Sequence, residues 1–128
     1  MKLLSIDEII AINVATTSQN GQKTFVRNPH GLESIVALPR QSAFGQQMYE
    51  TLAEKIGITF IKIINLHPFE DGNKRTAVIA AEIISRRNHN ELMMANDEIR
   101  DLALRVAKTD DSNLNYHDVY LQFERHLK

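Results

Sequence analysis

Residues 67–75 read His-Pro-Phe-Glu-Asp-Gly-Asn-Lys-Arg, and this polar stretch separates two strongly apolar segments, residues 56–66 and 76–84. Proline cannot continue a helix and disfavours helical angles in the residue before it, so a helix through the first segment is predicted to end at about Leu66. The second segment is apolar nearly all round, which predicts a central, buried helix. The stretch therefore predicts a polar loop that is held rigidly between two packed helices.

The end of this loop has the composition of an anion site. Gly72 permits a tight turn, and Asn73 is predicted to cap the second helix, whose first turn carries Lys74 and Arg75. The start of a helix has unpaired N–H groups and a partial positive charge, which suit acids better than bases. Two cations at that position therefore indicate a site that an anion completes, and phosphate is the usual ligand.

Two further side chains of the loop can take part in phosphate chemistry. Asp71 is suited to hold a hard cation such as Mg²⁺, and His67, at the end of the first helix, is a candidate base. The alternative is that the loop is only a solvated connection, which is the usual role of a short polar segment between two helices.

The nine-residue string resembles the signature of the Fic/Doc family, His-x-Phe-x-[Asp/Glu]-[Gly/Ala]-Asn-[Gly/Lys]-Arg, and it matches every fixed position. Its Asn-Lys-Arg ending is similar to the Doc (death-on-curing) branch. Members that transfer AMP generally read Asn-Gly-Arg-x-x-Arg, and this chain has Val78 at the position of the second Arg.

The resemblance implies a Doc-type toxin of a toxin–antitoxin pair, which uses ATP and Mg²⁺ to phosphorylate a hydroxyl of a translation factor, elongation factor Tu being the family's known substrate. His67 would then take the proton of the attacking hydroxyl, Asp71 would hold Mg²⁺, and Phe69 would anchor the loop. The residues that would stabilise charge on the phosphates are Gly72, Asn73, Lys74 and Arg75. Two alternatives stay open, an AMP transferase and a non-catalytic binding module that keeps the fold.

Composition narrows the class of protein. A chain of 128 residues is predicted to be one domain, residues 1–128, and its net charge of -1 gives no support to bulk binding of nucleic acid or of an anionic membrane. It has no cysteine and no apolar run long enough for a membrane span, so we expect a soluble, cytoplasmic protein.

The autoinhibitory pattern of many Fic proteins, Ser or Thr followed four positions later by Glu and then Gly or Asn, does not occur. We therefore expect an antitoxin in trans, with a disordered segment that folds onto a groove beside the flap.

The remaining sequence predicts an all-α, Fic-like bundle of about six helices. Apolar residues at helical spacing predict a first helix over residues 6–17, a helical region from 42 to 66, a helix from 96 to about 108 and a final helix through residues 119–127. The sequence leaves open whether Gly57 breaks the helical region from 42 to 66 into two helices. Polar residues predict a loop over positions 16–23.

A small β-hairpin flap is also predicted. Residues 24–26 and 34–37 are short β-like runs, and turn-forming residues lie between them. The alternative is a loop pinned by two apolar anchors. The resemblance implies that this segment is a flap that positions a target peptide by strand addition, with Gly31, Leu32 and Ser34 as the positioning residues.

Overall fold

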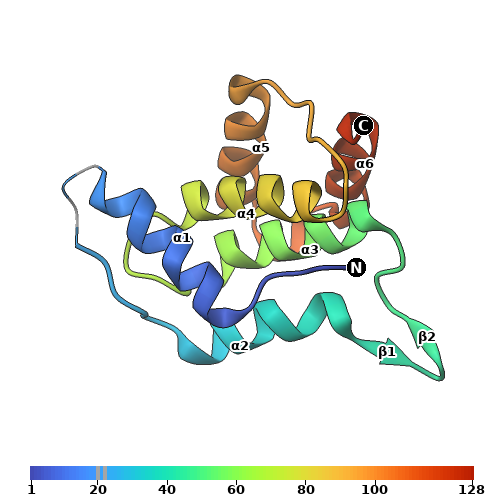
Figure 1. Cartoon of the computed structure of the whole chain (residues 1–128), viewed down its shortest axis with the longest axis horizontal. Coiled ribbons are helices and arrows are strands. Elements are labelled where there is room, and N and C mark those ends of the chain that lie inside the picture. The colour runs from blue at the N-terminus through green and yellow to red at the C-terminus, as the bar shows by residue number, and fades with distance from the viewer. Residues whose placement is uncertain (20, 22) are drawn as a thin grey trace.

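The computed structural model describes residues 1–19, 21 and 23–128, whose helices pack into a bundle (Figure 1). Within these residues the chain forms six α-helices, two short 3-10 helices and one two-stranded antiparallel hairpin. The α-helices are α1 (Ile6–Ser18), α2 (Pro29–Ala37), α3 (Leu52–Asn65), α4 (Asn73–Arg87), α5 (Asn96–Lys108) and α6 (Tyr116–His126). The predicted all-α bundle with a small hairpin is confirmed.

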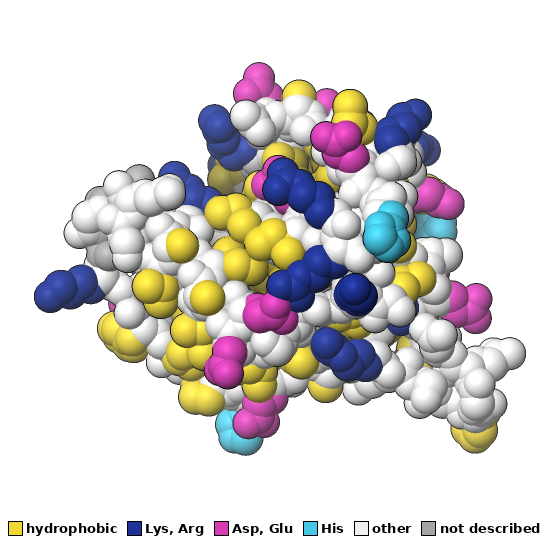
Figure 2. Space-filling model, viewed as in Figure 1, with side chains coloured by type: hydrophobic (Ala, Val, Ile, Leu, Met, Phe, Trp, Pro, Cys, Tyr) yellow, Lys and Arg dark blue, Asp and Glu magenta, His cyan; other side chains and the backbone are white. Residues whose placement is uncertain are grey.

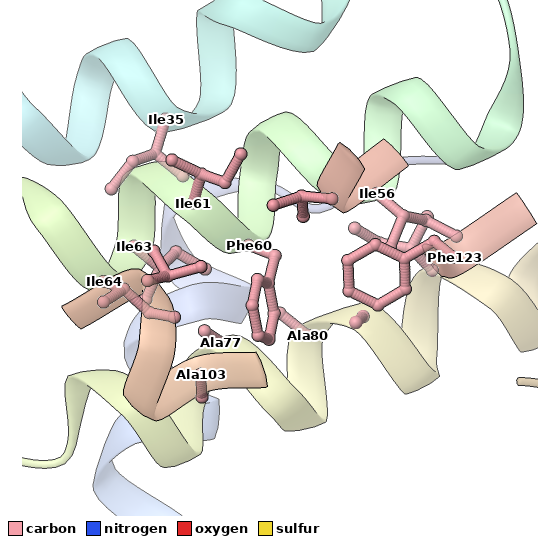
Figure 3. Close-up of a cluster of buried hydrophobic side chains, with 14 of the residues drawn as sticks. Ile35, Ile56, Phe60, Ile61, Ile63, Ile64, Ala77, Ala80, Ala103 and Phe123 are labelled. Carbon is pink, nitrogen blue, oxygen red and sulfur yellow. The ribbon is translucent and has the colours of Figure 1, made fainter. Parts of the chain in front are cut away.

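Helices α3 and α4 form the centre of the bundle. Helix α3 packs against α4, α6, α2 and α5, and most of its side chains are buried. Figure 3 shows Phe60 of α3 beside the small residues Ala77 and Ala80 of α4, and its ring meets Phe123 of α6 edge to face at 5.1 Å between centroids. Burial of each large apolar side chain contributes roughly 1.5–3 kcal/mol, so this cluster fixes both helices that flank residues 67–75.

Gly57 does not break α3, which continues through it without interruption. A Cβ atom at this position would lie 2.4 Å from Cδ1 of Tyr120 in α6, so only glycine allows α6 to approach this closely. Close packing therefore outweighs the ~1 kcal/mol by which glycine disfavours a helix interior.

The predicted hairpin of residues 24–26 with residues 34–37 is wrong. Residues 29–37 form α2, in which Pro29 is the first residue and the Asn28 side chain caps the helix start. Both residue types favour a helix start at those positions. Apolar side chains spaced three apart on α2 are buried against the bundle, and this packing overrides the β propensity of the second run.

The three residues assigned to a target-positioning flap consequently lie in α2. Gly31 and Leu32 are buried, and Ser34 is exposed on the same helix. Their backbone groups serve the helix, as in the bond from Leu32 N–H to the Asn28 carbonyl at 3.1 Å. As part of a helix they cannot pair with an added strand, so the predicted strand addition is wrong at these residues. A role of Gly31, Leu32 and Ser34 in positioning a target stays a prediction.

The hairpin of this chain is formed by β1 (Ser42–Ala43) and β2 (Gln46–Gln47). Its turn residues, Phe44 and Gly45, have φ angles of 53° and 78°, the left-handed values that a type I′ turn requires. The prediction of a helical region from residue 42 is therefore correct only from Leu52 onward. Phe44, which matched the helical spacing, is instead fully exposed at the tip.

The hairpin lies at the N-terminal end of α3, whereas residues 67–75 follow its C-terminal end (Figure 1). A helix rises about 1.5 Å per residue, so the two ends of this helix of 14 residues are ~21 Å apart. The hairpin therefore does not cover the polar loop in this structure.

The other predicted helices agree with the structure. Helix α1 begins with the capping box of Ser5 and Glu8 and extends to Ser18, slightly into the predicted loop over positions 16–23. Two residues of that loop, Asn20 and Gln22, lie outside the described residues. Helix α5 begins and ends where the sequence predicts. No helix in the described part of the chain is long and apolar enough to cross a membrane.

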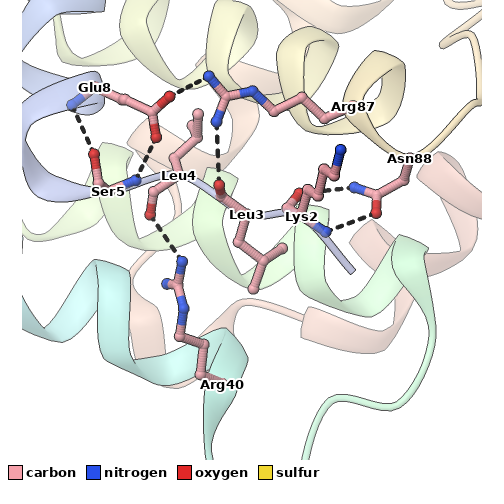
Figure 4. A network of polar contacts seen from close by, with 8 residues as sticks. All are labelled: Lys2, Leu3, Leu4, Ser5, Glu8, Arg40, Arg87 and Asn88. Carbon is pink, nitrogen blue, oxygen red and sulfur yellow. Dashed lines mark hydrogen bonds and ion pairs between the residues drawn. The ribbon is translucent and has the colours of Figure 1, made fainter.

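The N-terminal segment is fastened across α4 by polar contacts (Figure 4). The Asn88 side chain exchanges two hydrogen bonds with the backbone of Lys2, at 2.9 and 2.8 Å. Arg87 donates to the Leu3 carbonyl and forms an ion pair with Glu8 of α1. The hydrogen bond from Arg87, together with hydrogen bonds from Ser5, lowers the pKa of the Glu8 carboxyl to about 2. These contacts hold α1 beside the C-terminal end of α4, and the polar loop lies at the opposite end, before the start of α4.

Candidate active site

The loop between α3 and α4 begins with a sharp change of direction. Leu66 ends α3, and His67 follows in the left-handed region with φ 47°. The His67 side chain is exposed, whereas Pro68 and Phe69 are buried. The histidine lines a cavity of about 390 Å³ together with Arg27, Asn28 and Leu66. The predicted end of the first helix at Leu66 is confirmed.

A short extended segment, residues 25–28, pairs with this loop. The Pro68 carbonyl accepts from the N–H groups of Arg27 and Asn28 at 2.8 and 3.1 Å, and Glu70 N–H donates to the Phe25 carbonyl at 3.0 Å. The antiparallel bridge between Val26 and Phe69 lies between these bonds. The β-like run near residue 25 thus pairs with the loop that contains His67, and not with residues 34–37.

Asn28 connects this segment to the end of α3. Its Nδ2 donates to the Leu66 carbonyl at 2.8 Å, while its Oδ1 accepts from Gly31 N–H at 2.9 Å. The Asn28 side chain therefore joins the start of α2 to Leu66, the residue that ends α3 and precedes His67. Asn28 is one of the turn-forming residues between the two β-like runs, and its position before Pro29 was the available sequence signal of a helix cap.

Asn73 braces the loop from the other side. Its Oδ1 accepts from Phe69 N–H at 3.1 Å, and its Nδ2 donates to the Phe69 carbonyl at 2.9 Å. The Phe69 ring is 1% exposed, which agrees with its predicted role as an anchor of the loop. Asn73 is the first residue of α4 and not its cap, because Gly72 occupies the cap position with φ 75°. Its amide is used to shape the loop, so its contribution to an anion would come from its backbone N–H.

Helix α4 begins with open hydrogen-bond donors. The first bond inside this turn runs from Thr76 N–H to the Gly72 carbonyl at 2.9 Å, and no side chain caps the helix. Within the described residues, the N–H groups of Asn73, Lys74 and Arg75 have no backbone partner. The Lys74 and Arg75 side chains are exposed and form no ion pair with another described residue. Donors and cations at a positive helix end favour an anion.

These donors face a larger cavity, of about 840 Å³, formed where α1, α4 and α5 meet. One end is lined by Asp71, Gly72 and the first residues of α4, and the other by residues of α5 that include Ile99, Arg100 and Leu104. On the face shown in Figure 2, apolar side chains are exposed between α1 and α4, and acidic and basic side chains lie near one another. The cavity thus joins a cationic end to a partly apolar wall.

The Asp71 carboxylate is held at the mouth of this cavity by its own turn. Its Oδ1 accepts from Gly72 N–H at 2.8 Å, which leaves the other oxygen available. No cluster of three or more potential metal-ligating side chains occurs among the described residues. A single carboxylate fits Mg²⁺, which commonly takes one or two protein carboxylates and completes its shell with phosphate oxygens and water.

The predicted catalytic and phosphate-binding residues therefore share one loop but line two different cavities. Asp71, Gly72, Asn73, Lys74 and Arg75 line the larger cavity, whereas His67 lines the smaller one. The residues of α1 and α5 that complete the larger cavity, and Arg27 beside His67, were not predicted. Their separation along the chain left no local signal that they would meet the loop.

Comparison with known proteins agrees with this geometry. Residues 3–85, which include α1 to α3 and most of α4, match the model of the family described as Fic: Fic/DOC family. A search of curated proteins found no match. The match covers the loop of residues 67–75 and more than half of the chain, and the family consists generally of nucleotide or phosphate transferases. This chain belongs to the Fic/DOC family.

Proposed function

We propose that this chain is a Doc-type protein kinase, the toxin of a toxin–antitoxin pair, which transfers the γ-phosphate of ATP to a hydroxyl of a translation factor. The observation that carries the proposal is the uncapped start of α4, where open N–H groups and two exposed cations border the larger cavity. Fic family enzymes typically use ATP, and this site has the donors and charges that a nucleotide's phosphates need.

The residues of the loop divide the chemistry between them. The His67 imidazole accepts the proton of the attacking hydroxyl, and its exposure leaves it open to a protein substrate. Lys74, Arg75 and the N–H groups at the helix start stabilise negative charge on the phosphates. Asp71 would hold Mg²⁺, which neutralises phosphate charge when it is bound. Pairing of Pro68 and Glu70 with residues 25–28 holds the backbone between His67 and Asp71.

Phosphoryl transfer is favoured over AMP transfer by Lys74 and Val78. Lys74 places a bulky charge where the AMP-transferring pattern has glycine, and Val78 lines the same cavity without offering a donor. Loss of a charged hydrogen bond to phosphate costs ~1.5–3 kcal/mol, which disfavours the AMP-transferring pose by about tenfold or more. A pose with the γ-phosphate nearest His67 then becomes the better use of the loop.

The test is to incubate the protein with a translation extract and ATP labelled at either the α or the γ position. Label that passes to protein only from the γ position supports the kinase. Label from the α position would mean an AMP transferase, and label from neither would mean a non-catalytic module. A Lys74→Gly/Val78→Arg double variant should shift transfer toward the α label if these two residues set the pose.

The base assignment is tested with a matched pair of histidine variants. His67 and His89 are both exposed and both left-handed, with φ 47° and 61°, and they lie beyond opposite ends of α4. Asparagine tolerates this backbone conformation, so His67→Asn and His89→Asn impose little strain. We expect His67→Asn to lower the rate by ~10²–10⁴-fold and His89→Asn to leave it unchanged. Full activity or growth arrest by folded His67→Asn would refute the assignment.

The hairpin is the better candidate for positioning a protein target. Residues 42–47 are exposed, and their short strands offer edges for an added strand. Since the ends of α3 are ~21 Å apart, a target paired there needs about six extended residues to reach His67. Replacement of Ala43 by Pro should weaken substrate binding without changing hydrolysis of free ATP. Unchanged substrate binding would remove the hairpin from the proposal.

We also propose that an antitoxin restrains the protein in trans. The apolar wall of the larger cavity, which includes Val78, Ile99 and the 43% exposed Leu104, supports binding of an amphipathic segment. Titration calorimetry with the small protein encoded beside this gene should give tight binding with a negative heat-capacity change. Leu104→Glu should weaken that binding. Absence of binding, together with harmless expression of the free protein, would refute the pairing.

A further inference from the structure

Asn13 of α1 lies against the loop and has a side chain that is 0% exposed. Its Nδ2 donates to the Asp71 carbonyl at 2.8 Å and to Thr76 Oγ1 at 3.1 Å. In the sequence, these two acceptors lie on either side of Gly72, the left-handed residue at the cap position before α4. One amide group therefore holds both sides of the turn, across 58 and 63 residues of sequence.

The orientation of this amide is determined by its surroundings. The reverse orientation would place Oδ1 against the Asp71 carbonyl, and two acceptors repel each other. In the observed orientation, Asn13 Oδ1 is buried without a partner among the described residues. A buried acceptor without a partner costs about 1–3 kcal/mol. An apolar side chain would avoid this cost, but it would leave the Asp71 carbonyl and the buried Thr76 hydroxyl without this donor. The asparagine therefore holds the turn at the cost of one buried acceptor without a partner.

The amide acts on the functional groups through the backbone. The Asp71 carbonyl that it holds belongs to the same peptide unit as Gly72 N–H, and that N–H donates to Asp71 Oδ1 at 2.8 Å. The orientation of this peptide unit therefore determines the direction of the Asp71 carboxylate. Thr24 Oγ1 donates to the same carbonyl at 3.4 Å, which is a longer and weaker bond.

We infer that Asn13 is a positioning residue for binding of magnesium and nucleotide phosphate: it fixes the peptide between Asp71 and Gly72, and thereby the carboxylate and the open N–H groups of α4. The inference rests on the proposed function for its ligand, ATP with Mg²⁺. Its geometric part rests only on the contacts of Asn13. The hydrogen bonds of the Asn13 amide among the described residues go to Asp71 and Thr76, and none goes to His67, so its loss should weaken binding of the nucleotide more than it slows transfer.

The main variant is Asn13→Leu, which has a similar shape and no polar atoms. Asn13→Asp keeps the shape but places an oxygen opposite the Asp71 carbonyl, so we expect it to be the more damaging of the two. The control is Ser85→Ala, which removes a buried hydrogen bond of 2.8 Å, to the Ala81 carbonyl, from the distant part of α4. It tests what the loss of one buried polar contact does by itself.

Three measurements are made on each folded variant. These are the dissociation constant of ATP with Mg²⁺ by calorimetry, KM and kcat for transfer, and hydrogen exchange of the amides at residues 72–76. Loss of a group that orients a metal ligand typically weakens metal binding ~10–100-fold. We expect Asn13→Leu to raise the dissociation constant of ATP with Mg²⁺, and KM for ATP, by ~10–100-fold. The same variant should change kcat less and should speed hydrogen exchange at the Gly72 amide. Ser85→Ala should leave all three unchanged.

A merely structural role predicts a different result. In that case the folded fraction and kcat of Asn13→Leu would fall together. The dissociation constant and KM for ATP, and the hydrogen exchange at Gly72, would equal those of the unchanged protein. This outcome would overturn the inference. Failure of the proposed function is distinguishable, because it means that the unchanged protein transfers no label from the γ position. Binding and exchange are measured without any transfer, so they still decide the role of Asn13.

Discussion

Substitution of Gly72 by alanine tests the geometry on which the site depends. Gly72 has φ +75°, and a Cβ atom built on it would lie 2.7 Å from Thr17 Cγ2 and 3.2 Å from Asn13 Nδ2. The left-handed conformation costs a non-glycine residue roughly 1–2 kcal/mol. Forcing a methyl group into this contact with α1 costs a further ~1–3 kcal/mol. We therefore expect Gly72→Ala to lower the free energy of unfolding by ~2–5 kcal/mol, a large share of a typical ~5–15 kcal/mol.

Two further variants separate the strain from the contact. Gly45 has a similar φ of +78°, and nothing lies within 4 Å of its Cβ position, so Gly45→Ala measures strain without a clash. Thr17→Ser removes the Cγ2 atom and keeps the hydroxyl, which donates to the Asn13 carbonyl at 2.8 Å. In a double-mutant cycle, Thr17→Ser should recover the contact part of the Gly72→Ala cost, ~1–3 kcal/mol.

The assay is urea unfolding of the four proteins of the cycle, followed by circular dichroism, with Gly45→Ala alongside. The nucleotide affinity of each folded variant is measured in parallel, and Gly72→Ala should lose it. A contact between α1 and the turn is ruled out if Gly72→Ala destabilises no more than Gly45→Ala, or if Thr17→Ser gives no recovery in the double variant. Either result would mean that α1 does not press against the turn.

Three other predictions concern the frame around the site. Gly57→Ala should destabilise by ~1–3 kcal/mol, because its methyl would meet the Tyr120 ring at 2.4 Å, as a melting curve would record. Phe69→Ala should cost ~3–5 kcal/mol in urea unfolding, because the ring is 1% exposed, and a loss below ~1 kcal/mol would contradict its role as an anchor. Hydrogen bonds from Arg87 and from Ser5 lower the pKa of Glu8 from 4.5 to about 2, so the contribution of these contacts to stability is present above pH 4.5 and is lost as the pH falls toward 2. Glu8→Gln should flatten the stability profile in that window by at most ~1 kcal/mol, since both side chains are more than one third exposed.

The sequence alone was sufficient for most helices and for the loop between them. Pro68 ends the helix before it, and Ser5 with Glu8 starts α1, because these effects act within a few residues. The motif residues from His67 to Arg75 identified the family from their own spacing, and the match over residues 3–85 agrees. The positive charge at the start of α4 could also be predicted, because it comes from residues that are neighbours in the sequence.

Tertiary structure decided how this loop is held. The β-like run near Val26 pairs with Phe69, and the partner could not be deduced from a run of three residues. Residues 29–37 became helical because their apolar side chains bury against the bundle, and packing of this kind overrides local propensity. The hairpin forms at residues 42–47 and not at the predicted positions, because two left-handed residues form its turn there.

The clearest case is Asn13, which the sequence presents as one polar residue on the first helix. Its contact with Asp71 joins residues 58 positions apart, and such a bond leaves no periodic or local pattern to detect. Local chemistry therefore determined which residues could bind phosphate and start a helix. The packing of α1 against the start of α4 determined which distant side chains hold those residues in place, because a hydrogen bond forms wherever the folded chain brings donor and acceptor together.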